Sequence, residues 1–334
     1  MVTAPSVHTS DKVKPDWAGG DWLSRFVNFL IQIKPLYGIM KQQARQVLIK
    51  TAEKKGVPWQ KTVEELERSN LALYTMGCAG SSDRLTETPE VTYPDYYQVP
   101  FHAYDAGNLC WQAAFEAEPA TYAMALRVWP QETLTWQVAQ DRLRSSFHTI
   151  LGSYCPRVIH HCLDVGCSVG ISTRYLQRFL VDRQRESGII PETIGLDLSP
   201  YMLAVAQCRD PQGEITWVQG LAEATGFEDG YFDLVTLQFV LHELPNAPTI
   251  AIFQEIYRIL RPQGYLAITD NNPGSSVIQN LPPVLFTLMK STEPWSDEYY
   301  TFEVENSLEA IGFRLITTQA SDPRHRTIMV QKSL

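Results

Sequence analysis

The alternation of strand-like and helical runs after residue 156 is the feature that most constrains the fold. Short apolar runs repeatedly precede amphipathic stretches with helical spacing. That order is typical of a parallel sheet whose strands are joined by helical crossovers. It predicts strands at 158–164, 192–197, 214–219, 232–239 and 264–269, and helices at 170–181, 200–208 and 248–260. Near the C-terminus it predicts a helix at 301–311 and a hairpin of FRLITTQA and RTIMVQK, joined by SDPRH.

A region with a different pattern precedes this sheet. Residues 1–20 are polar with proline and glycine, which predicts a disordered or loosely ordered start. Residues 21–152 have mainly helical spacing, and their expected helices include 60–76, 108–128 and 131–151. We therefore divide the chain into this N-terminus, a helical cap that serves substrate binding or dimerisation, and a sheet domain at 153–334.

A long loop at 77–108 interrupts the helical region. Gly, Ser and Pro are frequent in it, and no periodicity survives. A loop of this length inside a compact chain is usually functional or mobile. Because it also carries several tyrosines, we expect it to cover a site.

Charge and cysteine usage restrict the partners. The net charge of −9 argues against nucleic acid, because basic side chains supply most of the affinity for phosphates. The six cysteines form no C-x-x-C pair, so we expect free thiols, a cytoplasmic location and no metal site. The apolar run at 22–33 is shorter than the roughly 20 residues of a membrane span, so we expect no stable membrane insertion.

A glycine turn follows the first predicted strand. In CLDVGCSVGISTRYL, Asp164 ends the strand, and Gly166 and Gly170 enclose the turn. Ligands of open α/β sheets bind at the carboxyl ends of the strands, where glycine lets the backbone approach them. The alternative is a tight turn without a ligand. The spacing is G-x-S-x-G, and Ile171 stands where a dinucleotide fingerprint has its third glycine.

Further motifs follow in order. The second strand ends in Asp197, which is placed to accept hydrogen bonds from two ribose hydroxyls. FEDGYFDLVTLQFVLHEL and LRPQG come next. Together with the glycine turn, this set resembles the class I S-adenosylmethionine-dependent methyltransferases, closest to their small-molecule subgroup, over residues 156–270. The resemblance implies a Rossmann-like α/β fold of seven mostly parallel strands, the last one antiparallel, with helices on both faces.

The resemblance also implies where S-adenosylmethionine would bind. The turn and Asp164 would hold its methionine part, Asp197 its ribose, and the end of the fourth strand would lie near the sulfonium. The implied cofactor-binding residues are Asp164, Gly166, Cys167, Ser168, Gly170, Asp197, Leu198, Met202, Ala222, Glu223, Gln238 and Phe239.

Two positions depart from the family pattern. Ser168 replaces the middle glycine, and we expect it to be tolerated because serine is small. Leu221 stands where many relatives carry an aspartate that binds the adenine amino group. Glu223 or a backbone group would then have to supply that contact.

Methyl transfer to a hydroxyl or ammonium group needs a base, because the acceptor loses a proton. His242, just beyond the fourth strand, is the candidate base, and Glu243 would orient it or remain solvated. Two alternatives stay open. His242 contacts the substrate without taking its proton, or the sequence HEL only begins the next loop and helix.

The acceptor should also touch the helical cap. His102, Tyr104 and Trp111 are candidates to line its pocket, with Trp295 from the segment after the fifth strand. Such walls suit an aromatic or hydrophobic small molecule, for example a specialised metabolite. The structural alternatives are surface packing of the aromatic residues and capping of the next helix by Asp105 or Asn108.

The main prediction is therefore a methyltransferase for a small molecule, with its helical region as a cap, a homodimer surface or both. One alternative is a catalytically inactive cofactor-binding partner protein. The other is an NAD(P)-dependent oxidoreductase, which the missing third glycine disfavours.

Overall fold

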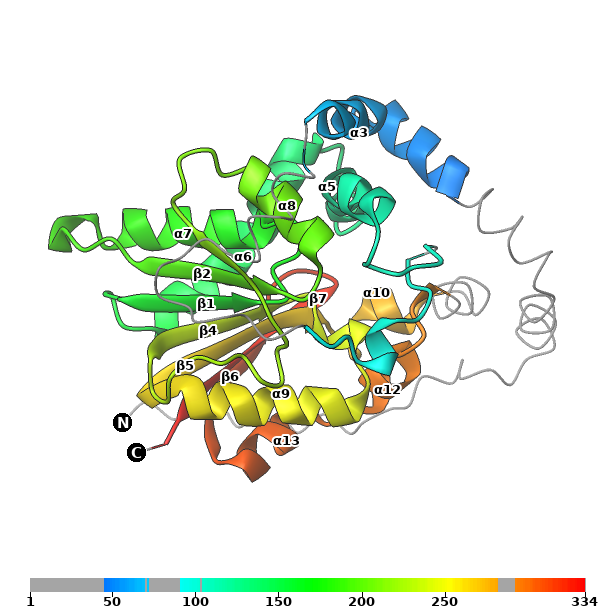
Figure 1. Ribbon diagram of the computed structural model, residues 1–334. Helices are drawn as coiled ribbons and strands as arrows, with labels where there is room; N and C mark the ends of the chain where they lie inside the picture. The colour runs from blue at the N-terminus through cyan, green and yellow to red at the C-terminus, as the bar shows by residue number, and fades with distance from the viewer. Residues whose placement is uncertain (1–44, 70, 72–90, 103, 282–291, 334) are drawn as a thin grey trace.

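The computed structural model describes residues 45–69, 71, 91–102, 104–281 and 292–333. A seven-stranded sheet in the order β3-β2-β1-β4-β5-β7-β6 forms its centre (Figure 1). The strands are β1 (His161–Val165), β2 (Glu192–Asp197), β3 (Thr216–Gln219), β4 (Phe232–Gln238), β5 (Leu260–Asn271), β6 (Phe313–Ala320) and β7 (His325–Lys332). The first five strands are parallel, and β7 is antiparallel to both β5 and β6. The predicted sheet with an antiparallel last strand is confirmed.

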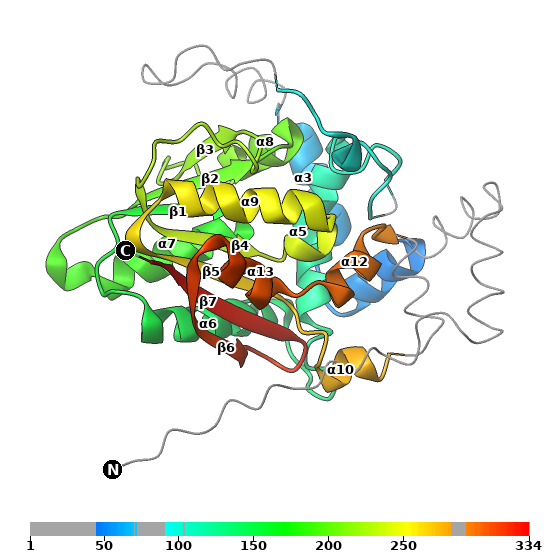
Figure 2. The same cartoon turned by 90° about the horizontal axis from the view of Figure 1, so that it is seen from below.

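Helices cover both faces of this sheet. α6, α7 and α8 lie on one face, and α9 and α13 lie on the other (Figures 1 and 2). The α-helices are α3 (Trp59–Arg68), α5 (Trp111–Ala125), α6 (Trp136–Tyr154), α7 (Ile171–Arg183), α8 (Pro200–Cys208), α9 (Asn246–Ile259), α10 (Ser276–Gln279), α12 (Ser296–Thr301) and α13 (Val304–Ile311). The 3-10 helices are η1 (Asp95–Tyr97), η2 (Arg185–Ser187) and η3 (Leu241–Glu243), and residues 45–54 are also helical.

The two faces have separate cores because side chains alternate along each strand. Cys162 packs with α6 and α7, whereas the next residue, Leu163, packs with α9 and α13. Leu234 and Val235 divide in the same way on β4. The inner strands are buried on both sides, which explains why they read as continuous apolar runs.

Several boundaries differ from the predicted ones. The helix expected at 60–76 ends at Arg68, and the helix expected at 131–151 begins at Trp136, where Thr135 accepts a hydrogen bond from the Val138 amide. β5 starts earlier than expected because Leu260 already pairs with Phe232, before a register shift in the ladder. The capping prediction for Asp105 or Asn108 is wrong, since Cys110 is the N-cap residue of α5 and its side chain makes no capping hydrogen bond. Residues 1–44, with the predicted disordered start, lie outside the described residues.

The helical region is fastened to the sheet domain through α5. Glu118 of α5 is buried and forms two ion pairs. One is with Arg174 of α7 at 3.0 Å, and the other is with Arg209, just after α8, at 2.7 Å. Ala113 and Ala114 of α5 share a core cluster with Met202 of α8. These contacts join α5 to α7 and α8, the helices that follow β1 and β2. The division at residue 152 itself stays a prediction.

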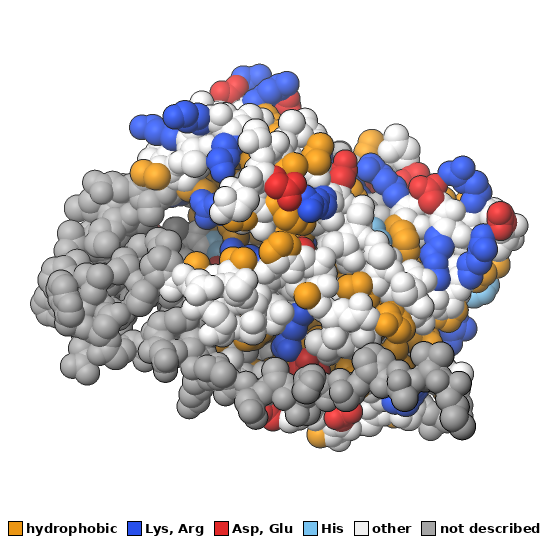
Figure 3. Space-filling model, turned by 180° about the vertical axis from the view of Figure 1, so that it is seen from behind, with side chains coloured by type: hydrophobic (Ala, Val, Ile, Leu, Met, Phe, Trp, Pro, Cys, Tyr) orange, Lys and Arg blue, Asp and Glu red, His pale blue; other side chains and the backbone are white. Residues whose placement is uncertain are grey.

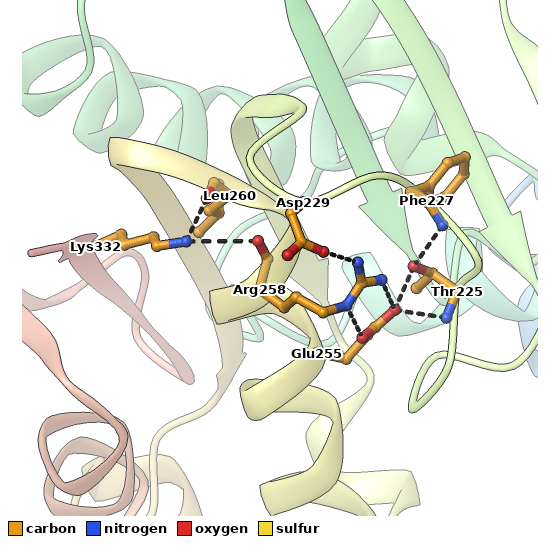
Figure 4. A network of polar contacts seen from close by, with 7 residues as sticks. All are labelled: Thr225, Phe227, Asp229, Glu255, Arg258, Leu260 and Lys332. Atoms are coloured by element: carbon orange, nitrogen blue, oxygen red, sulfur yellow. Dashed lines mark hydrogen bonds and ion pairs between the residues drawn. The ribbon is translucent and has the colours of Figure 1, made fainter.

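A polar network closes the opposite end of the sheet (Figure 4). Arg258 of α9 bridges Glu255 at 2.8 Å and Asp229 at 2.5 Å. The backbone amide and the hydroxyl of Thr225 both donate to Glu255, at 2.7 and 2.6 Å, and Lys332 donates to the Leu260 carbonyl at 2.7 Å. These contacts fix the start of β5 and leave the carboxyl edge free for chemistry.

Acidic and basic side chains are interspersed on the described surface in Figure 3, with single apolar side chains between them. In the described part of the chain, no helix combines the length and apolar character required to cross a bilayer. Among the same residues, no group of His, Cys, Asp or Glu side chains is arranged to hold a metal ion. Five cysteines are described, and all five are free thiols.

Candidate active site

Four acidic or amide side chains gather at the carboxyl edge of the sheet. Asp164, Asp197, Gln238 and Asp270 lie at or next to the carboxyl ends of β1, β2, β4 and β5. Because these strands are parallel and adjacent, their ends meet at one edge. The sheet therefore assembles polar groups that are far apart in sequence.

Asp164 is an internal anchor of this edge. Its carboxylate accepts hydrogen bonds from the hydroxyls of Thr173 and Thr236, each at 2.6 Å, and from Nε2 of Gln238 at 3.2 Å. Burial raises the pKa of Asp164, while these donors and the nearby Arg144 oppose that rise. The carboxylate thus ties β1 to β4 and to α7.

The turn after β1 needs glycine for reasons internal to the protein. Gly166 and Gly170 have φ angles of 69° and 75°, in the left-handed region. A Cβ atom on Gly166 would come within 2.7 Å of Val240, and one on Gly170 would overlap the Trp217 ring. Ser168, which replaces the middle glycine, also has a positive φ, of 50°. Its backbone therefore adopts the left-handed conformation although it is not glycine.

Asp197 is oriented by the same turn. Its Oδ2 accepts the backbone amide of Ser168 and its Oδ1 that of Ser199, both at 2.8 Å. Burial raises its pKa to about 6 against these two amides. Each oxygen keeps a further lone pair, an arrangement suited to two neighbouring hydroxyl groups.

The described part of the long loop covers the ends of β2 and β3. The Tyr96 hydroxyl donates to Oε1 of Glu223 at 2.5 Å, and Gln219 donates to the Tyr93 hydroxyl at 3.2 Å. Burial raises the pKa of Tyr97 most, and the nearby charges of Asp197 and Glu243 raise this pKa further. The aromatic loop thus overlies this edge of the sheet, as its composition suggests.

Glu223 retains an unused acceptor beside this loop. Its Oε2 atom is buried and has no hydrogen-bond partner among the described residues. Leu198 and Met202, which follow Asp197 in sequence, are buried, and Ala222, next to Glu223, packs against the core. Leu221 has no carboxylate where the family pattern has an aspartate. Two residues later, the buried Oε2 atom of Glu223 has no hydrogen-bond donor among the described residues and can accept one.

The end of β4 is strained. Phe239 has a φ of 63°, and its amide donates to the Thr269 carbonyl at 2.8 Å. A left-handed aromatic residue costs free energy and persists only where its surroundings hold it, which is frequent at functional sites. Next to it, Oε1 of Gln238 is buried without a hydrogen bond to any described residue.

His242 forms a dyad with Asp270. Nδ1 of His242 lies 2.8 Å from Oδ1 of Asp270, which is 2% exposed at the end of β5. Burial opposes a charged imidazole, but Asp270, Glu293 and Glu243 outweigh it and raise the pKa of His242 to about 10. Burial also raises the pKa of Glu243 to about 8, although His242 opposes this. His242 is therefore strongly basic and carries a proton at neutral pH, with carboxyl groups around it.

The residues predicted to line the acceptor pocket divide into two groups. Nε2 of His102 lies 3.9 Å from carboxylate oxygens of both Glu243 and Glu293, beside His242. Tyr104 instead donates to Glu116 of α5 at 2.6 Å, and Trp111 packs edge-on against Tyr201 of α8. Trp295 is half-buried just before α12, where its carbonyl accepts the Tyr299 amide at 3.1 Å.

Sequence reasoning gave no role to Asp270, Glu293, Tyr96 or Arg144. The signal for Asp270 was present, since it directly follows the strand predicted at 264–269, whereas Asp164 and Asp197 end theirs. The other three have no local motif. Tertiary packing alone brings them to this edge.

A family model described as a methyltransferase domain matches residues 163–268. The matched part of the chain is a class I S-adenosylmethionine-dependent methyltransferase domain. Its sequence is 33% identical to an uncharacterised methyltransferase of Synechocystis sp. over 155 residues, which cover 46% of this chain and 66% of that protein. It is 34% identical to the demethylmenaquinone methyltransferase of Lactococcus lactis over 105 residues, or 30% of this chain and 38% of that one. A crystal structure of a methyltransferase from Aquifex aeolicus superposes with a TM-score of 0.42 at 18% identity, covering 55% of this chain and 88% of that one.

The chain thus aligns with less than two thirds of the length of these two sequence relatives. S-adenosylmethionine is the cofactor of this methyltransferase family, and the described residues fit it. Asp197 offers two oriented oxygens to ribose hydroxyls, and the orphaned oxygen of Glu223 matches the need for an acceptor at the adenine amino group.

Proposed function

We propose that this methyltransferase acts on a small aromatic or hydrophobic molecule that bears an acidic hydroxyl group, and that His242 removes the hydroxyl proton. The observation that carries the proposal is the His242–Asp270 dyad at the carboxyl edge of β4 and β5. A buried base held by a carboxylate is typical of sites that move protons.

In this proposal, the polar groups at the carboxyl edge of the sheet determine where the cofactor binds. When bound, S-adenosylmethionine supplies an electrophilic methyl carbon on a sulfonium. Asp197 accepts the ribose hydroxyls, Glu223 accepts from the adenine amino group, and the turn from Gly166 to Gly170 lies against the methionine part. The tyrosines of the covering loop exclude water from this edge.

The pKa of the dyad selects the acceptor. A phenol-like hydroxyl has a pKa of about 10, close to that of His242, so proton transfer between them is nearly balanced. An aliphatic hydroxyl is far less acidic, so transfer of its proton to this base is much less favourable. Neutral His242, the form that can take a proton, becomes more populated as the pH rises toward about 10.

The named relative supports an aromatic acceptor. The Lactococcus lactis protein is named for demethylmenaquinone, a quinone. A reduced quinone ring carries phenol-like hydroxyls, which the His242–Asp270 dyad suits. Deprotonating such a hydroxyl makes both its oxygen and the adjoining ring carbons nucleophilic, so the proposal covers either atom as the methyl acceptor.

A thermal-shift titration with S-adenosylhomocysteine, beside NAD and NADP, tests the cofactor. A ligand that binds only the folded state stabilises it by about 2.7 kcal/mol at a hundredfold excess over its dissociation constant. We expect a shift with S-adenosylhomocysteine alone. A shift with NAD or NADP instead would support the oxidoreductase alternative.

Transfer assays with reduced quinones and simple phenols then test the acceptor. Binding of S-adenosylhomocysteine without transfer to any phenolic acceptor would support the inactive-partner alternative. The homodimer and the cytoplasmic location remain predictions, which light scattering and cell fractionation would check.

A further inference from the structure

Arg144 is a buried cation for which the proposed chemistry has no use. It lies on α6 and is 3% exposed. Its Nε and Nη1 atoms are buried and make no hydrogen bond to any described residue. Burial lowers its pKa to about 10, so the guanidinium stays charged at neutral pH. A buried charge whose donors are unpaired is costly, which makes a missing anionic partner the natural explanation.

The guanidinium faces the strained end of β4. Its Cζ atom lies 5.1 Å from the centre of the Phe239 ring. Asp164, Tyr122 and Tyr175 are near enough to act on its charge. Asp164 is not its hydrogen-bond partner, however, because that carboxylate is taken by Thr173, Thr236 and Gln238. The cationic donors therefore remain available at the edge where the cofactor belongs.

A neutral acceptor shares a neighbour with this cation, because Gln238 and Arg144 both lie near Asp164. Gln238 precedes Phe239 and gives its Nε2 to Asp164, which leaves its buried Oε1 without a hydrogen bond among the described residues. One corner of the site thus has cationic donors and an amide acceptor, both unused. An α-amino acid group has the complementary pair, a carboxylate for the guanidinium and an ammonium for the amide oxygen.

We propose that Arg144 binds the α-carboxylate at the amino-acid end of the cofactor, and that Oε1 of Gln238 accepts from the α-ammonium. This inference rests on the cofactor of the proposed function and adds to it a residue from the helical region. A planar guanidinium can bind a carboxylate through two parallel hydrogen bonds, which gives orientation as well as affinity. α6 thereby becomes part of the cofactor site.

The test compares S-adenosylmethionine with decarboxylated S-adenosylmethionine, which differs only in lacking the carboxylate. We expect the wild-type protein to bind the complete cofactor about 10- to 100-fold more tightly by calorimetry, as for a hydrogen bond to a charged group. Arg144→Met should bind both compounds with similar affinity. A purely structural role for Arg144 would weaken both equally and leave their ratio unchanged.

Arg142→Met is the matched control. Arg142 lies on the same helix, is exposed and pairs with Glu132 at 2.7 Å. This variant should keep the wild-type ratio. If Arg144→Met does not fold, Arg144→Lys keeps the charge but loses the two-pronged geometry, and its ratio should fall severalfold.

Three outcomes are distinct. Equal wild-type binding of the two compounds, or an unchanged ratio in the Arg144 variants, overturns the assignment of Arg144. Failure of the wild-type protein to bind either compound overturns the proposed function instead. Loss of the ratio in the Arg144 variants alone supports the inference.

Discussion

Asp270 holds His242 with both of its carboxylate oxygens. Oδ1 lies 2.8 Å from Nδ1 of the imidazole, and Oδ2 accepts the backbone amide of the same residue at 3.3 Å. His242 follows β4 and Asp270 lies near the end of the adjacent parallel strand β5, so the register of β4 on β5 helps to fix the dyad. The ring is oriented with Nε2 turned away from Asp270, and this nitrogen is the one available to an acceptor.

Asp270→Asn should move the pH dependence of methyl transfer to lower pH. Asp270 raises the pKa of His242 because its negative charge favours the imidazolium, so removing that charge lowers this pKa. The rise of kcat/KM with pH should then occur at lower pH. The plateau value of kcat/KM should also fall, because a weaker base takes the proton. Glu293, Glu243 and His102 remain beside His242 and keep part of the electrostatic environment.

His242→Ala supplies the reference for that profile. It should lower kcat by about 10²- to 10⁴-fold, as expected for loss of a general base, while the affinity for S-adenosylhomocysteine stays close to wild type. Pre-steady-state and steady-state assays over the same pH range would check both variants. An Asp270→Asn profile identical to wild type would show that the dyad does not set the reactive protonation state.

Asp197→Asn should weaken binding of S-adenosylhomocysteine by about 10- to 100-fold, because hydrogen bonds to a charged acceptor are lost. Burial raises the pKa of Asp197 to about 6, and ribose hydroxyls bond the ionised form better. Wild-type affinity should therefore be constant above about pH 7 and fall as the pH drops through about 6.

Calorimetry across this pH range checks the ribose assignment. The Asn variant should show little of the pH dependence, since it has no carboxylate to protonate. Asp182→Asn, an exposed aspartate on α7 that pairs with Arg185, should behave as wild type. A pH-independent affinity in the wild-type protein would contradict the role of Asp197.

The parallel strands and the functional edge of the sheet could be predicted because each strand has its own apolar run with a polar residue at or just after its end. Asp164 and Asp197 follow that rule, and Asp270 obeys it as well although its role was not inferred. Arg144 could not be predicted, because a single arginine in an amphipathic helix gives no sign that packing will bury it. Tyr104 and Trp111 are drawn into the packing of α5, since Glu116 and Tyr201 offer them partners that the sequence does not reveal.

Glu223→Ala should reduce discrimination at the adenine amino group. The buried Oε2 of Glu223 has no donor among the described residues, so the amino group would supply one. The variant should lose about tenfold of the preference for S-adenosylhomocysteine over S-inosylhomocysteine, which has a carbonyl in place of the amino group. Glu228→Ala, in the same loop and exposed, should keep the preference. If both variants discriminate equally well, a backbone group makes the adenine contact.

Glu118→Ala should destabilise the protein by about 3 kcal/mol, because it leaves two arginines without their shared buried carboxylate. Glu118 is 3% exposed, and it joins α5 to Arg174 at 3.0 Å and to Arg209 at 2.7 Å. Urea unfolding measures the loss. Glu132→Ala is the control. Glu132 pairs with Arg142 at 2.7 Å, and both side chains are 46% exposed. Such a surface pair contributes about 0–1 kcal/mol to stability. Equal losses in the two variants would show that Glu118 does not fasten the cap. A separate early transition in Glu118→Ala would show that the cap then unfolds before the sheet domain.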